Sequence, residues 1–321
     1  MTYPLRLHRT YINKPWAGDR LARLFPELVA EIPPSTGEVI ELCDLPSYSS
    51  VVANGPWRGR SIAQLLQTER ASLMGDLPLG PGDFPLCIKL LDTLQPLSIQ
   101  DHPGDRREGG KLVSRGKSEC WLVLDAAPDA VIYQGLKPGV TSAAFEAALA
   151  GNAPIDCLNA RTVRAGDFLY NEAGMIHAIG AGIALLEVQQ NSGITWRLWD
   201  FPREGGPREM HVQQGLEAAR FDLPLPPIQA TSGEDTLLAA QGPFGVRLLQ
   251  PNAARVLAKE WPGFTVLTCV AESCEVTAHQ RDNLQPAVLK AGDTVLYPAG
   301  FDRFELYPEP GCRLVVSWAR E

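Results

Sequence analysis

The sequence contains no long hydrophobic run. Its 321 residues are 45% hydrophobic, yet the longest apolar stretches extend over only about four to six residues, far short of the ~20 that a membrane-spanning helix needs. The N-terminus also lacks the apolar stretch behind basic residues that marks a secretory signal. We therefore expect a cytoplasmic protein without a signal peptide or membrane span, large enough to form two compact units.

Positive charge and paired cysteines are also scarce. Lysine and arginine together number 29 against 37 aspartates and glutamates, which gives a formal net charge of −8. This balance argues against nucleic acid as a partner, because a nucleic-acid-binding protein needs a basic face. The seven cysteines are odd in number and form no Cys-x-x-Cys pair. We expect buried free thiols in a reducing compartment.

Turn-forming residues, in contrast, are abundant. With 29 glycines and 27 prolines, the chain breaks into short apolar runs separated by turn signals, which predicts an all-β sandwich or barrel. Helical patterns are few, and we expect them to decorate the β framework; they cover residues 17–24, 61–74, 142–149 and 207–220. Residues 223–235 are rich in proline and polar side chains, so they are predicted to form a linker.

An internal repeat supports a division at this linker. Residues 163–174 and 289–300 share an Ala-Gly-Asp triplet, followed at the same spacing by a second glycine. This pattern is typical of cupins, small antiparallel jelly rolls that carry a metal at the barrel mouth. Only the first copy continues into a histidine, His177. We predict two cupin-type jelly-roll β-barrels: a catalytic, metal-binding domain over 1–225, and a degenerate domain without metal ligands over 236–321.

The candidate metal ligands lie in three separate segments. If residues 97–103 form a strand, Ser98, Gln100 and His102 share one of its faces. A polar face inside a barrel needs a compensating interaction, and a divalent cation provides one. Glu119 and His177 complete a set of two imidazoles, one amide and one carboxylate that suits Zn²⁺. The three other histidines are predicted to be structural: His8, His211 and His279.

Several segments, in order along the chain, resemble the motifs of the short bacterial type I phosphomannose isomerases. They are residues 37–44, 50–56, 100–103 (QDHP), 117–121 (KSECW), 177–179, 186–190 and 195–201 (TWRLWDF). The resemblance implies that Gln100, His102, Glu119 and His177 are zinc ligands, and that Lys117 and Arg197 are active-site cations. Two positions depart from the family pattern. Asp101 replaces a residue that is often apolar, and Gly193 replaces an acidic residue considered part of the catalytic apparatus.

An aldose–ketose isomerase also needs a proton carrier and cations for the sugar phosphate. The candidates for the carrier are Glu187 and Lys117. Arg197 is the main candidate for binding phosphate, with Lys117 and Lys89 as further cations. Each has a structural alternative. Arg197 could pair with Asp200 or Glu187, and Lys89 could be a surface lysine on an edge strand. Ser98 could contact substrate or be a structural hydroxyl, and the aromatic residues Trp196, Trp199 and Phe201 are expected in the core.

The resulting hypothesis is a zinc-dependent isomerase that interconverts mannose 6-phosphate and fructose 6-phosphate through a cis-enediol. One alternative is a cupin metalloenzyme of other chemistry, an oxygenase or dehydratase, although Gln100 as an added ligand weighs against an iron site of two histidines and one carboxylate. Another is a non-catalytic sugar-phosphate-sensing module. The expected partner is a small sugar phosphate, without nucleic acid or membrane; monomer and homodimer both stay open.

Overall fold

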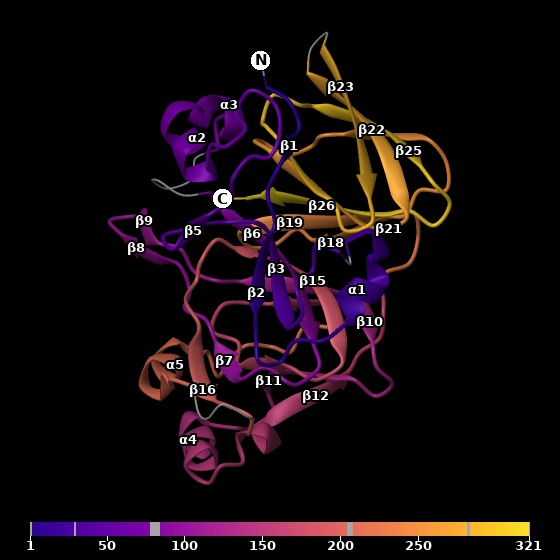
Figure 1. The fold of residues 1–321 in the computed structure, drawn as a ribbon. Helices are drawn as coiled ribbons and strands as arrows, with labels where there is room; N and C mark the ends of the chain where they lie inside the picture. Colours follow the sequence, from indigo (N-terminus) through magenta and orange to yellow (C-terminus); the bar gives the residue numbers. More distant parts are fainter. Residues whose placement is uncertain (1, 29, 78–83, 204–207, 281–282, 321) are drawn as a thin grey trace. The chain divides into compact units, whose positions relative to one another are not determined.

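The protein, represented by a computed structural model, is described over residues 2–28, 30–77, 84–203, 208–280 and 283–320. Antiparallel strands dominate it, and short helices lie between them (Figure 1). The all-β prediction is therefore confirmed. No helix among these residues is both long and apolar enough to cross a bilayer. Cys157 is half-buried, and the six other cysteines are buried.

The chain divides into two compact units that are not contiguous in sequence. Unit 1 comprises Met1–Thr10, Ile40–Ile88 and Thr231–Glu321, and unit 2 comprises Tyr11–Val39 and Lys89–Ala230. The C-terminal repeat thus shares its unit with two N-terminal segments. The assignment of one catalytic and one metal-free domain stays a prediction.

Two sheets build unit 1. A six-stranded sheet has the order β1-β24-β21-β26-β19-β18, and a four-stranded sheet has the order β20-β25-β22-β23. Side chains from both sheets form one hydrophobic core that includes Leu267, Val276 and Val316. The strands are β1 (Leu5–Arg6), β18 (Asp235–Ala239), β19 (Phe244–Leu249), β20 (Arg255–Ala258), β21 (Thr265–Ala271), β22 (Ser273–Gln280), β23 (Asn283–Lys290), β24 (Thr294–Tyr297), β25 (Arg303–Pro308) and β26 (Arg313–Ala319).

Unit 2 is likewise built around two sheets, one of seven strands in the order β17-β13-β10-β15-β6-β3-β2 and one of five in the order β12-β11-β14-β7-β16. The strands are β2 (Thr10–Asn13), β3 (Thr36–Leu42), β6 (Leu86–Thr93), β7 (Ile99–Asp101), β10 (Glu119–Ala126), β11 (Val131–Leu136), β12 (Leu158–Thr162), β13 (Asp167–Asn171), β14 (His177–Ile179), β15 (Ile183–Gln190), β16 (Trp196–Trp199) and β17 (Gln229–Ala230). Each unit also has one small hairpin: β4 (Asp44–Leu45) with β5 (Tyr48–Ser49) in unit 1, and β8 (Arg106–Glu108) with β9 (Lys111–Ser114) in unit 2. In each unit the facing sheets are separate ladders, so the jelly rolls are sandwiches and not closed barrels.

The predicted repeat folds into two turns of the same conformation. Gly166 and Gly292 both have φ of +91°, a left-handed value that favours glycine. In each turn the following aspartate accepts a hydrogen bond from the main-chain N–H three residues earlier, Asp167 from Arg164 at 2.9 Å and Asp293 from Lys290 at 3.1 Å. The repeat therefore encodes the same glycine turn, with its aspartate hydrogen bond, at two places in the chain.

Helices occur where the sequence patterns predicted them, with shifted bounds. They are α1 (Arg20–Leu24), α2 (Ile62–Thr68), α3 (Arg70–Met74), α4 (Ser142–Ala150) and α5 (Val212–Ala218), with short 3₁₀ turns at Pro26–Leu28 and Pro154–Cys157. The pattern over 61–74 is divided at Glu69, and α2 begins with a capping box between Ser61 and Gln64. Part of the 207–220 pattern lies outside the described residues. The predicted linker contains a short strand, β17, which pairs with β13.

Candidate metal centre

The candidate ligands come from both sheets of unit 2. On the five-stranded sheet, Gln100 of β7 lies directly opposite His177 of β14 on one side and Arg197 of β16 on the other. Residues paired in this way project to the same face of a sheet. Glu119 begins β10 in the seven-stranded sheet, where it is paired with Gln189 of β15. The polar faces of the two sheets thus supply one cluster.

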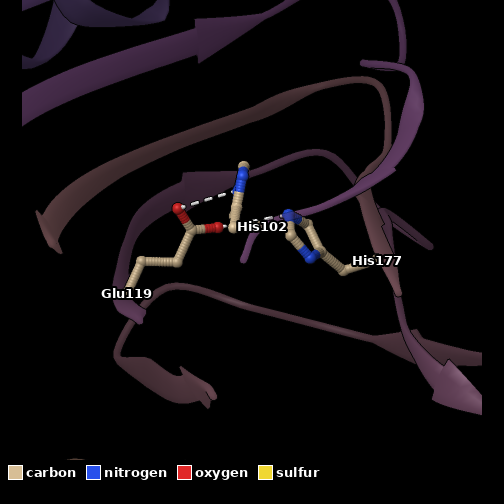
Figure 2. Close-up of side chains that lie close together, drawn as sticks. All are labelled: His102, Glu119 and His177. Atoms are coloured by element: carbon tan, nitrogen blue, oxygen red, sulfur yellow. Dashed lines mark ion pairs between the residues drawn. The ribbon is translucent and has the colours of Figure 1, made fainter. Parts of the chain in front are cut away.

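The two histidines and the glutamate converge on a small volume. Figure 2 shows both imidazoles directed at the Glu119 carboxylate, with His102 Nε2 3.4 Å from Oε2 and His177 Nε2 3.2 Å from Oε1. One ligand atom from each residue lies within 4.8 Å of the other two, as a shared metal ion requires. All three side chains are at most 2% exposed.

Both imidazoles are oriented by main-chain carbonyl groups. Nδ1 of His102 lies 2.9 Å from the carbonyl oxygen of Ile194, and Nδ1 of His177 lies 2.8 Å from that of Met175. An Nδ1 that donates its proton to a carbonyl leaves Nε2 with a free lone pair in the neutral ring. Metal-binding histidines are typically held in this way.

The electrostatics of the cluster require a cation. Burial, together with the neighbouring Lys117 ammonium, lowers the pKa of His102 to about 3, so the ring is neutral. A neutral Nε2 lone pair facing a carboxylate is repulsive unless a positive charge lies between them. Burial alone would raise the pKa of Glu119, but Lys117 and the histidines hold it well below its ordinary value. The donor set therefore fits a metal ion.

Lys117 supplies the nearby positive charge in this structure. Its side chain is buried, its Nζ is 2.9 Å from His102 Nε2, and it donates a hydrogen bond to Oε2 of Glu119. Gln100 lies next to this group, with Nε2 3.5 Å from His177 Nε2 and Oε1 accepting a hydrogen bond from Ser98 at 3.0 Å. Rotation of the amide would exchange its oxygen and nitrogen. The structure thus brings all four predicted ligands together.

Lys89 and Glu187 belong to the same polar interior. Lys89 on β6 is 3.2 Å from Glu187 Oε1 and 2.9 Å from Gln189 Oε1, while Trp121 Nε1 donates to Glu187 Oε2 at 3.1 Å. The lysine side chain is only 14% exposed. The alternative of a surface lysine is therefore wrong for Lys89.

Arg197 is half-buried and points toward Ser98. Its Nε donates to the Ser98 hydroxyl at 3.3 Å, and this hydroxyl in turn contacts Gln100. Neither of the two suggested partners forms an ion pair with Arg197. Asp200 is paired with Arg203 and Arg208 instead, and Glu187 is paired with Lys89. Burial and the nearby Arg208 lower the pKa of Arg197. The structural ion pair considered for Arg197 does not form.

Four charged residues near this interior were not singled out from the sequence. Lys14 pairs with Glu38 at 2.9 Å, and the pKa of Glu38, which burial would raise, is held down by Lys89 and Lys14. Arg203 and Arg208 lie close enough to the candidate cation Arg197 for their charges to lower its pKa. Glu38 lies in a segment that resembled the isomerase motifs, so it could have been found there. Arg203 follows the last such motif by two residues.

Of the three aromatic residues expected in the core, Trp199 and Phe201 pack there, whereas Trp196 lies against the His211 ring, with 5.5 Å between the ring centroids. Trp199 and Phe201 meet edge to face, with 4.8 Å between their ring centroids, and pack against a hydrophobic cluster that contains Ile99 and Leu198.

Asp101 projects away from the metal cluster and is fully buried. Neither of its carboxylate oxygens has a hydrogen-bond partner among the described residues.

An antiparallel sandwich with a buried His-Glu-His centre defines a metal-capable protein of the cupin class. Comparison with known proteins narrows this class. Mannose-6-phosphate isomerase ManA from Bacillus subtilis is 32% identical over 95% of this chain and 96% of its own length, and mannose-6-phosphate isomerase from Streptococcus mutans is 30% identical over 93% of both. The crystal structure of the mannose 6-phosphate isomerase from Bacillus subtilis covers 99% of this chain with a TM-score of 0.84 and 28% identity.

The chain belongs to the mannose-6-phosphate isomerase family. A more distant structure, a putative mannosephosphate isomerase from Archaeoglobus fulgidus, is 18% identical with a TM-score of 0.74 and supports the fold alone. No family model matches the sequence.

Proposed function

We propose that this protein is a zinc-dependent aldose–ketose isomerase that interconverts mannose 6-phosphate and fructose 6-phosphate through a cis-enediol. The observation that carries the proposal is the convergence of two imidazoles and a carboxylate on one buried point, within a family of named isomerases. Lysine and arginine side chains from the surrounding strands supply cations for an anionic sugar.

Gln100, His102, Glu119 and His177 would hold the zinc ion. Two nitrogen donors, one amide oxygen and one carboxylate are a borderline ligand set that suits Zn²⁺ and leaves a position open. When bound, zinc stabilises the negative charge that develops on the sugar oxygens during isomerisation. The carbonyl groups of Ile194 and Met175 keep the two imidazoles in the orientation that this role needs.

Lys117 is the proposed proton carrier between C1 and C2. Its amine is the titratable group in contact with the ligands His102 and Glu119, so it lies where the reacting carbons of a bound sugar would be expected. Glu187, the other candidate, has one oxygen bound by Lys89 and the other by Trp121. We assign Glu187 the role of holding the Lys89 side chain in the interior.

The phosphate is assigned to the cations beside Arg197. Arg197 and Ser98 are linked to Gln100 by hydrogen bonds and would contact the sugar between the metal ligands and the phosphate. Arg203 adds an observation from the structure: its side chain is 4% exposed, yet Nε and Nη1 have no hydrogen-bond partner within the described part of the chain. Buried N–H groups without acceptors are costly, and a phosphate group would satisfy them. Lys89 is a further substrate-binding cation.

Proton NMR of mannose 6-phosphate incubated with the protein in D₂O tests this function. We expect fructose 6-phosphate to form with deuterium entering at the carbon that exchanges its proton, and the reaction to stop on chelation. Release of water from the sugar would favour the dehydratase alternative, and consumption of oxygen would favour the oxygenase. Tight binding of sugar phosphate without any turnover would favour a sensing module.

A further inference from the structure

The carboxylate of Asp200 binds two arginines at once. Oδ2 accepts a hydrogen bond from Arg208 Nε at 2.6 Å, and Oδ1 accepts from Arg208 Nη2 at 2.7 Å and from Arg203 Nη2 at 2.8 Å. The Asp200 side chain is only 8% exposed. This geometry, bidentate on one side, is the most directional that a carboxylate and guanidinium adopt.

Each arginine also has a second fixed contact. The Arg208 guanidinium lies over the Trp16 ring, 5.0 Å from its centroid, and the ammonium of Lys14 lies over the same ring at 5.0 Å. Arg203 Nη2 donates to the carbonyl oxygen of Pro96 at 3.0 Å. The two guanidiniums are therefore held by a shared carboxylate together with one aromatic ring and one main-chain oxygen.

The cluster continues into the proposed substrate site. Asp200 follows Arg197 by three residues at the end of β16, and Pro96 precedes Ser98 by two. Arg197 and Ser98 are hydrogen-bonded. Three arginines and one aspartate leave a formal excess of two positive charges, which matches a phosphomonoester dianion.

We propose, on the basis of the proposed function, that Asp200 is a positioning residue: its carboxylate fixes Arg203 and Arg208 beside Arg197 so that the phosphate dianion of the substrate meets preorganised donors. Without Asp200 the two long side chains would repel each other and occupy many rotamers. Ordering them at the moment of binding would then weaken affinity. Asp200 itself carries a negative charge, so its direct effect on a phosphate is repulsive.

These two effects have opposite signs, and Asp200→Asn separates them. The substitution keeps the size of the side chain but removes its charge and its bidentate acceptor. If Asp200 positions the arginines, the Kd for fructose 6-phosphate rises about tenfold or more, with a parallel rise in KM for mannose 6-phosphate and kcat changed less than about twofold. If Asp200 acts only through its charge, both Kd and KM fall.

Isothermal titration of the protein after metal removal provides the Kd independently of turnover. The matched control is Glu209→Gln, which removes a carboxylate close to Arg197 from a side chain that is 85% exposed. We expect this variant to bind sugar phosphate as well as the wild type or slightly better. An unchanged or lower Kd in Asp200→Asn would overturn the proposal, as would a fall in melting temperature with Kd unchanged.

Asp200→Glu provides a second test that does not alter charge. The extra methylene displaces the carboxylate, so a positioning role predicts a higher Kd, whereas a purely electrostatic role predicts no change. This variant decides the question if Asp200→Asn does not fold. Failure of the proposed function looks different, because the wild-type protein itself would then neither bind nor isomerise the sugar phosphate.

Discussion

The two copies of the Ala-Gly-Asp turn lead into interiors of opposite character. In unit 2 the turn at Gly166 is followed by His177, which faces Glu119 and His102 among buried charged and amide side chains. In unit 1 the turn at Gly292 leads to Tyr297 and Phe301, which pack against each other in a hydrophobic core. The turns have the same φ and the same aspartate hydrogen bond. The difference between the two interiors therefore lies in the residues that follow the turn.

The largest expected effect comes from removing a histidine in unit 2, compared with removing one in unit 1. His177→Ala removes a donor from the proposed metal site, so we expect loss of bound metal and a fall in isomerase activity of about 10⁴-fold. The matched control is His279→Ala in unit 1, where His279 pairs with Glu305 near the surface. This control should keep both metal and activity. Elemental analysis and an isomerase assay measure the two outcomes, and equal losses in both variants would refute the contrast.

Lys117→Met tests whether the polar interior performs the proton transfer. We expect kcat to fall about 10²–10³-fold, while metal content is retained because removal of the ammonium leaves His102 and Glu119 free to bind a cation. The exposed Lys111 on β9 offers a control, since Lys111→Met should not change kcat. A normal kcat in Lys117→Met would show that another residue carries the proton.

Phe301→Ala tests the packing role of unit 1. The side chain is fully buried in the aromatic core, so its removal should lower the free energy of unfolding by about 3–5 kcal/mol. Metal content of the remaining folded protein should not change. Tyr307→Ala on β25, where the side chain is 47% exposed, should lower the free energy of unfolding far less. Urea denaturation measures both, and similar values for the two variants would contradict the packing role.

The smallest effect concerns Asp101, the buried carboxyl on the far face of β7. Burial raises its pKa from 3.8 to about 8. Between about pH 4 and pH 8 the carboxyl group is therefore ionised in the unfolded chain but protonated in the folded protein. The free energy of unfolding then falls as the pH rises. Asp101→Asn cannot titrate and escapes this loss. Its unfolding free energy relative to wild type should therefore increase from pH 5 to pH 6.5, by on the order of 2 kcal/mol. Parallel pH profiles of the two proteins would contradict the assignment.

The sequence predicted the features that depend on short-range pattern. Strand alternation placed Ser98, Gln100 and His102 together, and the repeated turn located His177; both depend on a few adjacent residues. Asp200 was considered only as a partner of Arg197. Its actual partners depend on how the chain turns after β16, and no periodicity encodes that turn.

Charges inside the sandwich were also difficult to predict. Glu38 and Lys14 are separated by 24 positions, and Lys89 is 98 positions from Glu187. Lys89 and Glu187 were candidates for the site, but the sequence did not pair them with each other. Strand order brings each charge beside its partner. The break of the second helical pattern at Glu69 is a smaller example, because nothing in the apolar spacing of residues 61–74 marks it.

The most direct test of the contrast between the two interiors is a zinc titration of chelated protein, with bound metal and isomerase activity measured on the same samples. Our account predicts that activity on mannose 6-phosphate returns in proportion to bound zinc and saturates at about one ion per chain, with no return in His177→Ala. Full activity in metal-free protein, or recovery of the His177→Ala protein to the wild-type level, would contradict it.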